Sequence, residues 1–494
     1  MTTLSRCILL PPLSDTVDSH IDLPRKLLPH LIAVEKFQER IKKEFSRNQL
    51  SLRRLWPPTL VSSGIHSQKA LRLAKTSLVF SQCGYFQEAE ERQRVVMDFV
   101  CNIRGADHPR AMDITLALSG TLRQQARAAE AAELQQQVLQ ICLKTLGPTH
   151  SRTLKVMDAL GESRRLEGRF TESIELHQTA IKGMESLLSE KDAALFHALG
   201  HLGVTLWYCF RYDEAKQHQE RAVQGLKTIL GPANLETLNA VEALAVTNLE
   251  LGTKLLENNE EVGSQILSTA HRDMEFVMQE RTKQLGEHQP YTWLAKCNLG
   301  RIKAAMGELT EGEDIIRSLL PIAAGHLGEN HLGVLAGKSH LAKILIKQGR
   351  FTEAEDILTD ISRPERYRSA GAAAGEHPDR FDALWNLTEC YKRQDRFEDC
   401  LRICDELSTT VIRIRKARNQ TDTSDTFLQM IRDRQAEIQS LANVTTVEVP
   451  TNSPEESSST AGDTGTSHSE LQALAAGIQT PANSSMLRQR GKRT

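Results

Sequence analysis

The sequence has few aromatic residues, little net charge and no long apolar run. Phe, Trp and Tyr make up 5% of its 494 residues, whereas the helix-favouring residues Leu, Ala, Glu, Gln and Arg are plentiful. A net charge of −2 gives no electrostatic reason to expect nucleic acid or an anionic membrane as the partner. No stretch approaches the ~20 apolar residues that a membrane-spanning helix needs, so we expect no membrane span.

The nine cysteines are scattered, and none forms a Cys-x-x-Cys pair. Their odd number and the length of the chain argue against a disulfide framework of the secreted kind. The short apolar run near the N-terminus is interrupted by Pro11 and Pro12, which argues against a signal peptide. These absences favour a cytoplasmic protein, and the basic residues between 488 and 493 leave a nuclear location open.

The motifs of common catalytic and metal sites are also missing. Gly333 to Ser339 comes close to a phosphate-binding loop, but it is one residue short and lies inside a predicted helix with no strand before it. His197 and His201 have the i, i+4 spacing of two zinc ligands, but the sequence places no third ligand, and we interpret them as surface or groove histidines. We therefore predict no enzymatic activity, no cofactor and no metal, and we do not expect a small-molecule substrate.

A turn recurs along the chain at a fixed spacing. Each copy carries His, Asn, Gln or Asp at one anchor position, in most copies two or three residues after a glycine. The anchors are His108, His150, Asp192, Asn234, Gln289, His331 and His377. The steps between them are 42, 42, 42, 55, 42 and 46 residues. Four equal steps exclude coincidence, and the sequence therefore consists largely of repeats.

The interior of each repeat keeps the same register. Ten residues past every anchor lies Leu, and the residue after it is small, which lets a neighbouring helix approach closely. A turn with Gly or a polar residue then precedes an aromatic and a Glu-Ala-like pair. The leucines are Leu118, Leu160, Leu202, Leu244, Leu299, Leu341 and Leu387. Each repeat is predicted to form two helices, and an eighth, earlier repeat begins near His66.

One hairpin cannot bury both of its apolar stripes, so stacked neighbours must cover them. The fold prediction is an all-α solenoid of about eight 42-residue helix hairpins. We divide the chain into an N-terminal segment with an amphipathic capping helix (1–63), the repeat array (64–418), a C-terminal capping helix (419–442) and a disordered tail (443–494). In the fourth repeat, thirteen extra residues around 252–264 are predicted to lengthen a loop.

The Gly-x-x-His-Pro turn, the Leu-small pair and the Gly-x-Phe/Tyr-x-Glu-Ala turn resemble the tetratricopeptide repeats of kinesin light chains. They are also similar to the C-terminal arrays of NB-ARC-type signalling proteins, especially fungal ones. The resemblance covers residues 64–418. It implies a right-handed superhelix whose concave face, lined mainly by the first helices, holds a peptide or another protein. The light-chain type usually carries Asn eight residues past the anchor. Here that position holds Leu116, Asp158, Gly200, Glu242, Cys297, Ser339 and Trp385.

We therefore predict a non-enzymatic scaffold or adaptor whose concave groove binds segments of other proteins. The alternative is the sensor half of an NB-ARC-type signalling protein that lacks its nucleotide-hydrolysing domain. Polar residues of the predicted first helices are the candidate groove residues. They are Lys155, Asp158, His197, Asn239, Glu242, Asn298, Lys338 and Lys392.

Overall fold

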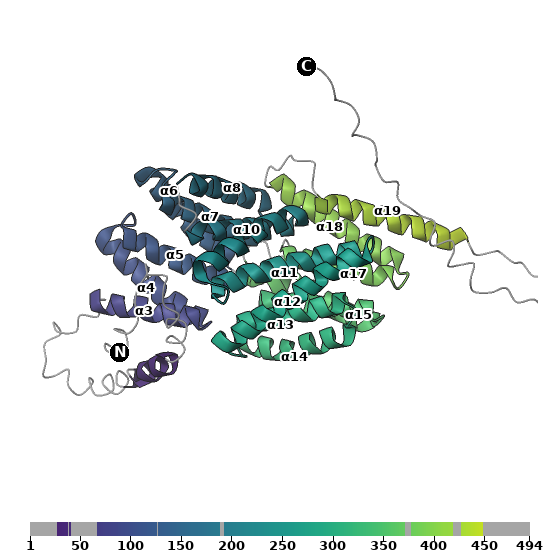
Figure 1. The fold of residues 1–494 in the computed structure, drawn as a ribbon, viewed down its shortest axis with the longest axis horizontal. Coiled ribbons are helices and arrows are strands. Elements are labelled where there is room, and N and C mark those ends of the chain that lie inside the picture. The colour runs from purple at the N-terminus through teal and green to yellow at the C-terminus, as the bar shows by residue number, and fades with distance from the viewer. Residues whose placement is uncertain are drawn as a thin grey trace, which may run out of the picture. The chain divides into compact units, whose positions relative to one another are not determined.

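The computed structural model describes residues 27–37, 39–40, 67–125, 127–187, 192–370, 377–417 and 426–447, and in these ranges the chain forms helices and turns without a strand (Figure 1). No helix in this part of the chain is both long and apolar enough to cross a membrane. A short helix over residues 27–37 precedes the numbered elements. These are α3 (Ser67–Gln82), α4 (Phe86–Arg104), α5 (Pro109–Gln124), α6 (Ala128–Thr145), α7 (Ser151–Leu166), α8 (Phe170–Leu187), α9 (Ala193–Tyr208), α10 (Tyr212–Leu230), α11 (Leu235–Leu256), α12 (Glu260–Leu285), α13 (Pro290–Ala305), α14 (Leu309–Leu327), α15 (Leu332–Lys347), α16 (Phe351–Ile361), the 3-10 helix η2 (Pro364–Ala370), α17 (Pro378–Lys392), α18 (Phe397–Ala417) and α19 (Thr426–Val447).

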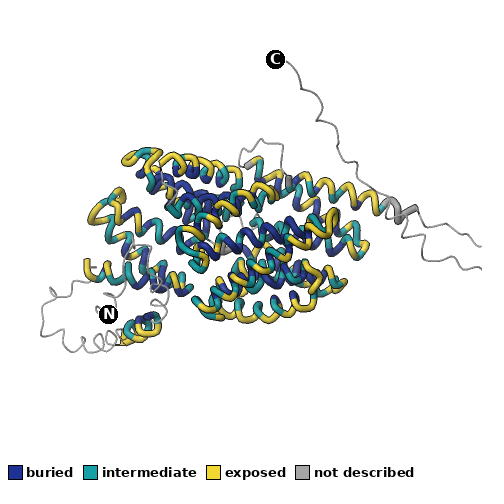
Figure 2. The backbone as a smooth tube through the Cα atoms, viewed as in Figure 1, coloured by how far each residue is buried: buried dark blue, intermediate teal, exposed yellow. Residues whose placement is uncertain are grey.

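The helices from α3 to α18 pair into eight consecutive hairpins, and each helix packs on the helix before and after it. First helices of successive hairpins also touch, as α15 and α17 do. Buried residues lie along the helix sides that face neighbouring helices (Figure 2). The described residues thus confirm the predicted all-α solenoid of about eight hairpins, and α3 begins one residue after His66.

The anchor residues are helix N-caps, which explains why their chemistry recurs. Seven first helices follow an anchor residue. In six of them, the anchor side chain accepts a hydrogen bond from the backbone N–H two residues later, at 2.9–3.2 Å. Nδ1 of His, Oδ1 of Asn and Oδ1 of Asp can all accept at this position, and the bond satisfies one of the free N–H groups at the start of a helix. Gln289 forms no such bond, so its longer side chain keeps the position in the repeat without the capping function.

The turn inside six of the hairpins uses a residue with positive φ. Gly84, Gly168, Gly307 and Gly349 occupy this position with φ between 70° and 97°, a left-handed conformation that ends a helix and suits glycine. In two repeats Phe210 (φ 60°) and Asp395 (φ 56°) take its place. The turn therefore survives the loss of glycine, and the prediction of a C-cap at these sites is confirmed.

The Leu-small pair marks the point where the two helices of a hairpin are closest. All seven predicted leucines are buried. A Cβ atom added to Gly161 would lie 2.7 Å from the imidazole of His177 on α8. A Cβ atom added to Gly300 would lie 3.0 Å from the carbonyl oxygen of Gly312 on α14. The small residue therefore makes room for the second helix, as the sequence predicted.

The insertion in the fourth repeat lengthens helices and not a loop, so that prediction is wrong. α11 has 22 residues and α12 has 26, whereas α9 has 16 and α10 has 19. The inserted residues are mostly helix formers, and Asn259 caps α12 by accepting a hydrogen bond from the N–H of Val262 at 3.2 Å. The extra turns pack on each other through Gly252 and Gly263, so the insertion extends the hairpin.

Gly263→Ala is expected to lower the melting temperature, because the added Cβ would lie 2.7 Å from the backbone nitrogen of Leu256 and 2.9 Å from the carbonyl oxygen of Gly252. Overpacking against backbone costs about 1–3 kcal/mol, more than the ~1 kcal/mol that Ala gains over Gly inside a helix. The control is Gly325→Ala on α14, where nothing lies within 4 Å of the new Cβ. Thermal unfolding followed by circular dichroism should show an unchanged or raised midpoint for Gly325→Ala. A higher midpoint for Gly263→Ala would contradict the close approach of α11 and α12.

Helices cover both ends of the repeat array. Leu31 of the N-terminal helix packs against Val79 and Cys83 of the first hairpin, and Ile431 and Ile438 of α19 are buried in the same cluster as the last hairpin. α19 continues to Val447, past the predicted boundary at 442. The rest of the predicted disordered tail, and the segment before residue 27, lie outside the described residues.

Candidate partner-binding cavity

The first helices of five consecutive repeats border a cavity of about 1520 Å³. α9, α11, α13, α15 and α17 supply most of its walls, and α8, α10, α18, α19 and the turn between α9 and α10 contribute to the remainder. Each first helix turns polar as well as apolar side chains toward the cavity. The stacking of the hairpins therefore creates one shared concave surface, which is called the cavity below.

Aromatic side chains gather on one side of the cavity, although the sequence as a whole has few. Tyr208 stacks on Phe170 with 5.7 Å between ring centroids, and the ring of Phe427 stacks on those of Phe210 and Phe381 at 6.3 Å. Trp385 meets the edge of Phe427 at 6.0 Å. These rings come from early and late repeats, so the aromatic surface exists only in the folded array.

Polar groups of the cavity are mostly engaged with one another. Asp382 accepts hydrogen bonds from Lys343 at 2.9 Å and from Ser339 at 2.8 Å. Arg301 forms an ion pair with Glu250 at 2.8 Å. Asp379 is less engaged: among the described residues, only Nδ1 of His377, at 3.8 Å, comes within ion-pair distance of its carboxylate.

Burial raises the pKa of Asp379 above its usual value, and the carboxylate of Asp382 raises it further. Burial also raises the pKa of the neighbouring Tyr208 phenol to about 12. Nε1 of Trp207, Nδ1 of His340 and Oε1 of Gln219 belong to residues that border the cavity, and they are buried without a hydrogen-bond partner among the described residues. The cavity thus presents an aromatic surface and the carboxylate of Asp379, which has no strong cationic partner among the described residues.

Three of the eight sequence-predicted groove residues border the cavity, namely Asn239, Glu242 and Asn298. All three form hydrogen bonds within the protein. The amide of Asn298 donates a hydrogen bond to Glu242 at 2.9 Å, and Arg281 donates one to Asn239 at 2.6 Å. Their polar atoms are therefore committed to the wall of the cavity.

The other five predicted groove residues do not border it. Lys155 lies 3.6 Å from Asp192, His197 lies 2.8 Å from Glu236, and Lys338 lies 2.7 Å from Glu329. Lys392 pairs with Glu437 on α19. Asp158 is buried between two imidazoles.

The aromatic residues and Asp379 were missed by sequence reasoning. The cluster of aromatics from Trp207 to Tyr212 was the available signal, because it breaks the low aromatic content of the rest of the chain.

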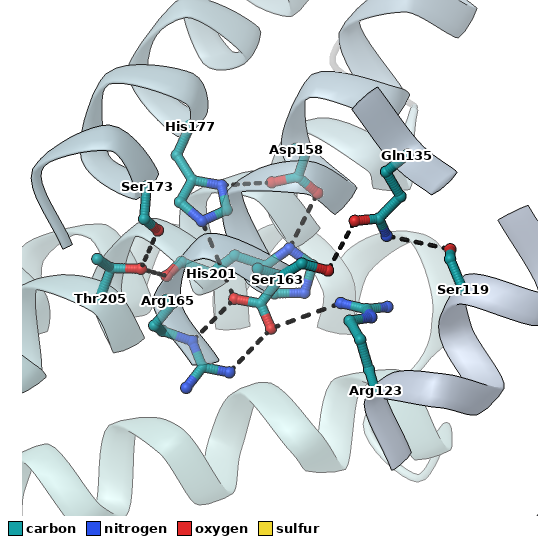
Figure 3. Close-up of polar contacts among 11 residues, drawn as sticks. Ser119, Arg123, Gln135, Asp158, Ser163, Arg165, Ser173, His177, His201 and Thr205 are labelled. Carbon is teal, nitrogen blue, oxygen red and sulfur yellow. Dashed lines mark hydrogen bonds and ion pairs between the residues drawn. The ribbon is translucent and has the colours of Figure 1, made fainter. Parts of the chain in front are cut away.

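A second polar cluster lies among α7, α8 and α9, in two neighbouring repeats (Figure 3). Nδ1 of His177 lies 2.7 Å from one carboxylate oxygen of Asp158, and Nδ1 of His201 lies 2.9 Å from the other. Glu162, one helical turn after Asp158, forms an ion pair with Arg165 at 3.0 Å. Burial by itself lowers the pKa of His201, but the carboxylates of Asp158 and Glu162 outweigh this effect and raise that pKa to about 9.

In the sequence, His197 and His201 have the i, i+4 spacing of two zinc ligands, but in the structure their side chains have different partners. His197 turns to Glu236, whereas His201 joins Asp158 from the preceding repeat and His177 from the second helix of that repeat. Within the described ranges, this is the set of three residues whose side chains could share a metal ion.

Two family models match this chain, and both describe the tetratricopeptide repeat, over residues 110–186 and 196–236. Residues 110–186 and 196–236 carry tetratricopeptide repeats. The matched ranges cover α5 to α8 and most of α9 and α10, where the 42-residue spacing is most regular. Neither model describes an NB-ARC-type domain. A search of curated proteins found no match.

Solved structures with similar folds include repeats of a putative kinesin light chain from Podosopora anserina, 20% identical, covering 44% of this chain and 97% of that one, with a TM-score of 0.35. A Rap protein complexed with competence and sporulation factor is 12% identical and covers 76% of this chain and 99% of that one, with a TM-score of 0.44. A signal transduction ATPase with a tetratricopeptide repeat sensor from Pyrococcus horikoshii is 12% identical, covers 76% of this chain and 52% of that one, and has a TM-score of 0.36.

Proposed function

We propose that this chain is a non-enzymatic scaffold or adaptor that holds a segment of another protein in the cavity. The observation that carries the proposal is a cavity of about 1520 Å³ bordered by the first helices of five repeats. Pockets for small molecules usually measure about 300–1,000 Å³, so the volume favours a peptide segment over a metabolite. Its aromatic walls can bury apolar side chains, and its polar atoms can fix the orientation of the guest.

The guest segment that fits best carries a Lys or Arg beside apolar residues. Asp379 has no strong cationic partner, and the rings of Tyr208 and Phe381 border the same cavity. A guest cation would form an ion pair with this carboxylate and could lie over an aromatic face, two interactions that strengthen when water is excluded.

The alternative from the sequence, a sensor half of an NB-ARC-type signalling protein, assigns the same cavity to a protein that works with an ATPase domain. It predicts a P-loop domain encoded directly upstream in the genome. A gene without such a neighbour would leave the scaffold as the better account. In either case we expect the protein to act in the cytoplasm, on protein or peptide partners.

Ala243→Trp is expected to weaken peptide binding by about 10-fold or more, because Ala243 on α11 borders the cavity and the indole would occupy the space of a guest side chain. Peptides would be selected from a random display library on the wild-type chain and their affinities measured by fluorescence anisotropy.

Ala436→Trp is the matched control, because Ala436 is exposed on α19 and does not border the cavity. It should bind the selected peptides as the wild type does. Peptides that bind all three proteins equally would place the binding surface elsewhere and overturn the proposal.

A further inference from the structure

The cluster of Asp158, His177 and His201 has the composition of a metal site. One ligand atom from each residue lies within 4.8 Å of the other two. Two imidazoles and one carboxylate are a usual set of protein ligands for Zn²⁺. Tetrahedral coordination with bonds of about 2.0–2.1 Å puts neighbouring ligand atoms about 3.3 Å apart, between the 2.7 Å of the shorter hydrogen bond and the 4.8 Å limit. Small side-chain rotations would bring the three atoms onto one ion.

Each of the three residues comes from a different helix, and packing fixes two of them. Asp158 stands on α7, His177 on α8 and His201 on α9 (Figure 3). The side chain of His177 is fully buried, and its ring lies against Gly161, where any larger residue would collide with it. The side chain of His201 is 37% exposed. The arrangement gives two rigid ligands and a third that an ion can reach from solvent.

The second ring nitrogen of His177, Nε2, is not satisfied in the hydrogen-bonded arrangement, which indicates that a metal ion is missing from it. When Nδ1–H of neutral His177 donates to Asp158, its Nε2 carries only a lone pair. That Nε2 is buried, has no hydrogen-bond partner among the described residues, and faces the carboxylate of Glu162 at 3.9 Å. A lone pair opposite a carboxylate is unfavourable.

A metal ion removes this conflict. An ion bound to Nδ1 of His177 uses the lone pair of that nitrogen, so the single proton of the neutral ring resides on Nε2. Nε2–H then faces Glu162 as a donor. Metal-ligating histidines almost always donate their other N–H to a carboxylate or carbonyl, and Glu162 supplies that partner. It is itself held by Arg165 through hydrogen bonds of 3.0 and 3.1 Å.

We propose that Asp158, His177 and His201 bind one divalent transition-metal ion, Zn²⁺ being the ion that suits two imidazoles and a carboxylate best, with Glu162 orienting His177. The fourth coordination position would open toward solvent beside His201 and take a water molecule. The ion would join α7, α8 and α9, and so fix the relative position of two neighbouring hairpins.

The test uses the purified full-length chain after treatment with a chelator and exhaustive dialysis. Zn²⁺ binding is measured by isothermal titration calorimetry, and Co²⁺ serves as the spectroscopic probe. We expect one equivalent of either ion, with Co²⁺ absorption bands of nitrogen and oxygen ligation and without the charge-transfer band of a thiolate. His201→Ala should weaken binding more than about 100-fold, and Glu162→Gln about 10- to 100-fold.

His197→Ala is the matched control, because His197 lies one turn earlier on the same helix and pairs with Glu236. It should bind the ion as tightly as the wild type. Helicity measured by circular dichroism shows whether each variant is folded. His201→Ala is the decisive variant, because the side chain of His201 is partly exposed. A wild-type chain that binds no ion at micromolar concentration would overturn the proposal. Equal affinity in wild type and His201→Ala would also overturn it.

Discussion

Asp158→Ala is expected to lower the free energy of unfolding by about 3–5 kcal/mol in chelator-treated protein, because breaking a buried ion pair leaves its partner uncompensated. Asp158 is 8% exposed and joins two imidazoles from two helices, at 2.7 and 2.9 Å. Without it, His177 has no acceptor for Nδ1–H, and His201 loses the charge it faces. Urea denaturation followed by circular dichroism measures the loss as a lower midpoint.

Asp113→Ala is the control for this variant. Asp113 also stands on a first helix and pairs with a residue of the next repeat, Arg152, but its side chain is 53% exposed. Exposed ion pairs contribute about 0–1 kcal/mol, so this substitution should change the midpoint little. Asp158→Asn keeps the shape and one hydrogen-bond acceptor, and should fall between the two. Equal, small losses for Asp158→Ala and Asp113→Ala would show that the buried cluster adds no stability.

The repeat and its boundaries were predictable from the sequence because they depend on local chemistry. His150, Asn234 and His331 recur at one position since each can cap the helix that follows. Glycine recurs in the turns since positive φ suits it best. Such rules act within a few residues, and a fixed spacing therefore reports them directly. The insertion at 252–264 shows the limit of this reasoning, because helix propensity and an Asn cap extended two helices where a loop was expected.

The cavity was less predictable, since its walls combine residues that are far apart in the sequence. Phe427 meets Phe210 across more than 200 residues, and no spacing rule links them. Which face of a first helix borders the cavity also depends on helix rotation, which the 42-residue period does not determine. Asn239 and Glu242 border the cavity, whereas Lys338 on an equivalent helix pairs with Glu329 outside it.

The cluster of Asp158, His177 and His201 also combines residues that are far apart in the sequence. The i, i+4 pair His197 and His201 suggested a site on one helix, but the partners of His201 come from two other helices. His177 lies in the second helix of its repeat, where the repeats 42 residues before and after it carry Gln135 and Gln219. A search by local spacing therefore found one ligand, and only packing brought the other two to it.

Arg281→Met is expected to destabilise the fourth repeat by about 3–5 kcal/mol, because it leaves the buried carboxylate of Glu242 without its cation. Arg281 is 1% exposed on α12. Its guanidinium forms an ion pair with Glu242 at 2.8 Å and donates to the backbone oxygen of Tyr291 at 2.9 Å and to Asn239 at 2.6 Å. One side chain thus ties α12 to α11 and to the start of α13.

The same substitution should also weaken guest binding, since Glu242 and Asn239 form part of the cavity wall that Arg281 supports from behind. Arg272→Met, at an exposed position on the same helix, is the control and should change stability by less than about 0.5 kcal/mol. Combining Arg281→Met with Glu242→Gln removes both charges, so it should recover about 2 kcal/mol of the loss. Urea denaturation and the peptide-binding assay measure both effects. Strictly additive losses in the double variant would mean that the two charges do not stabilise each other.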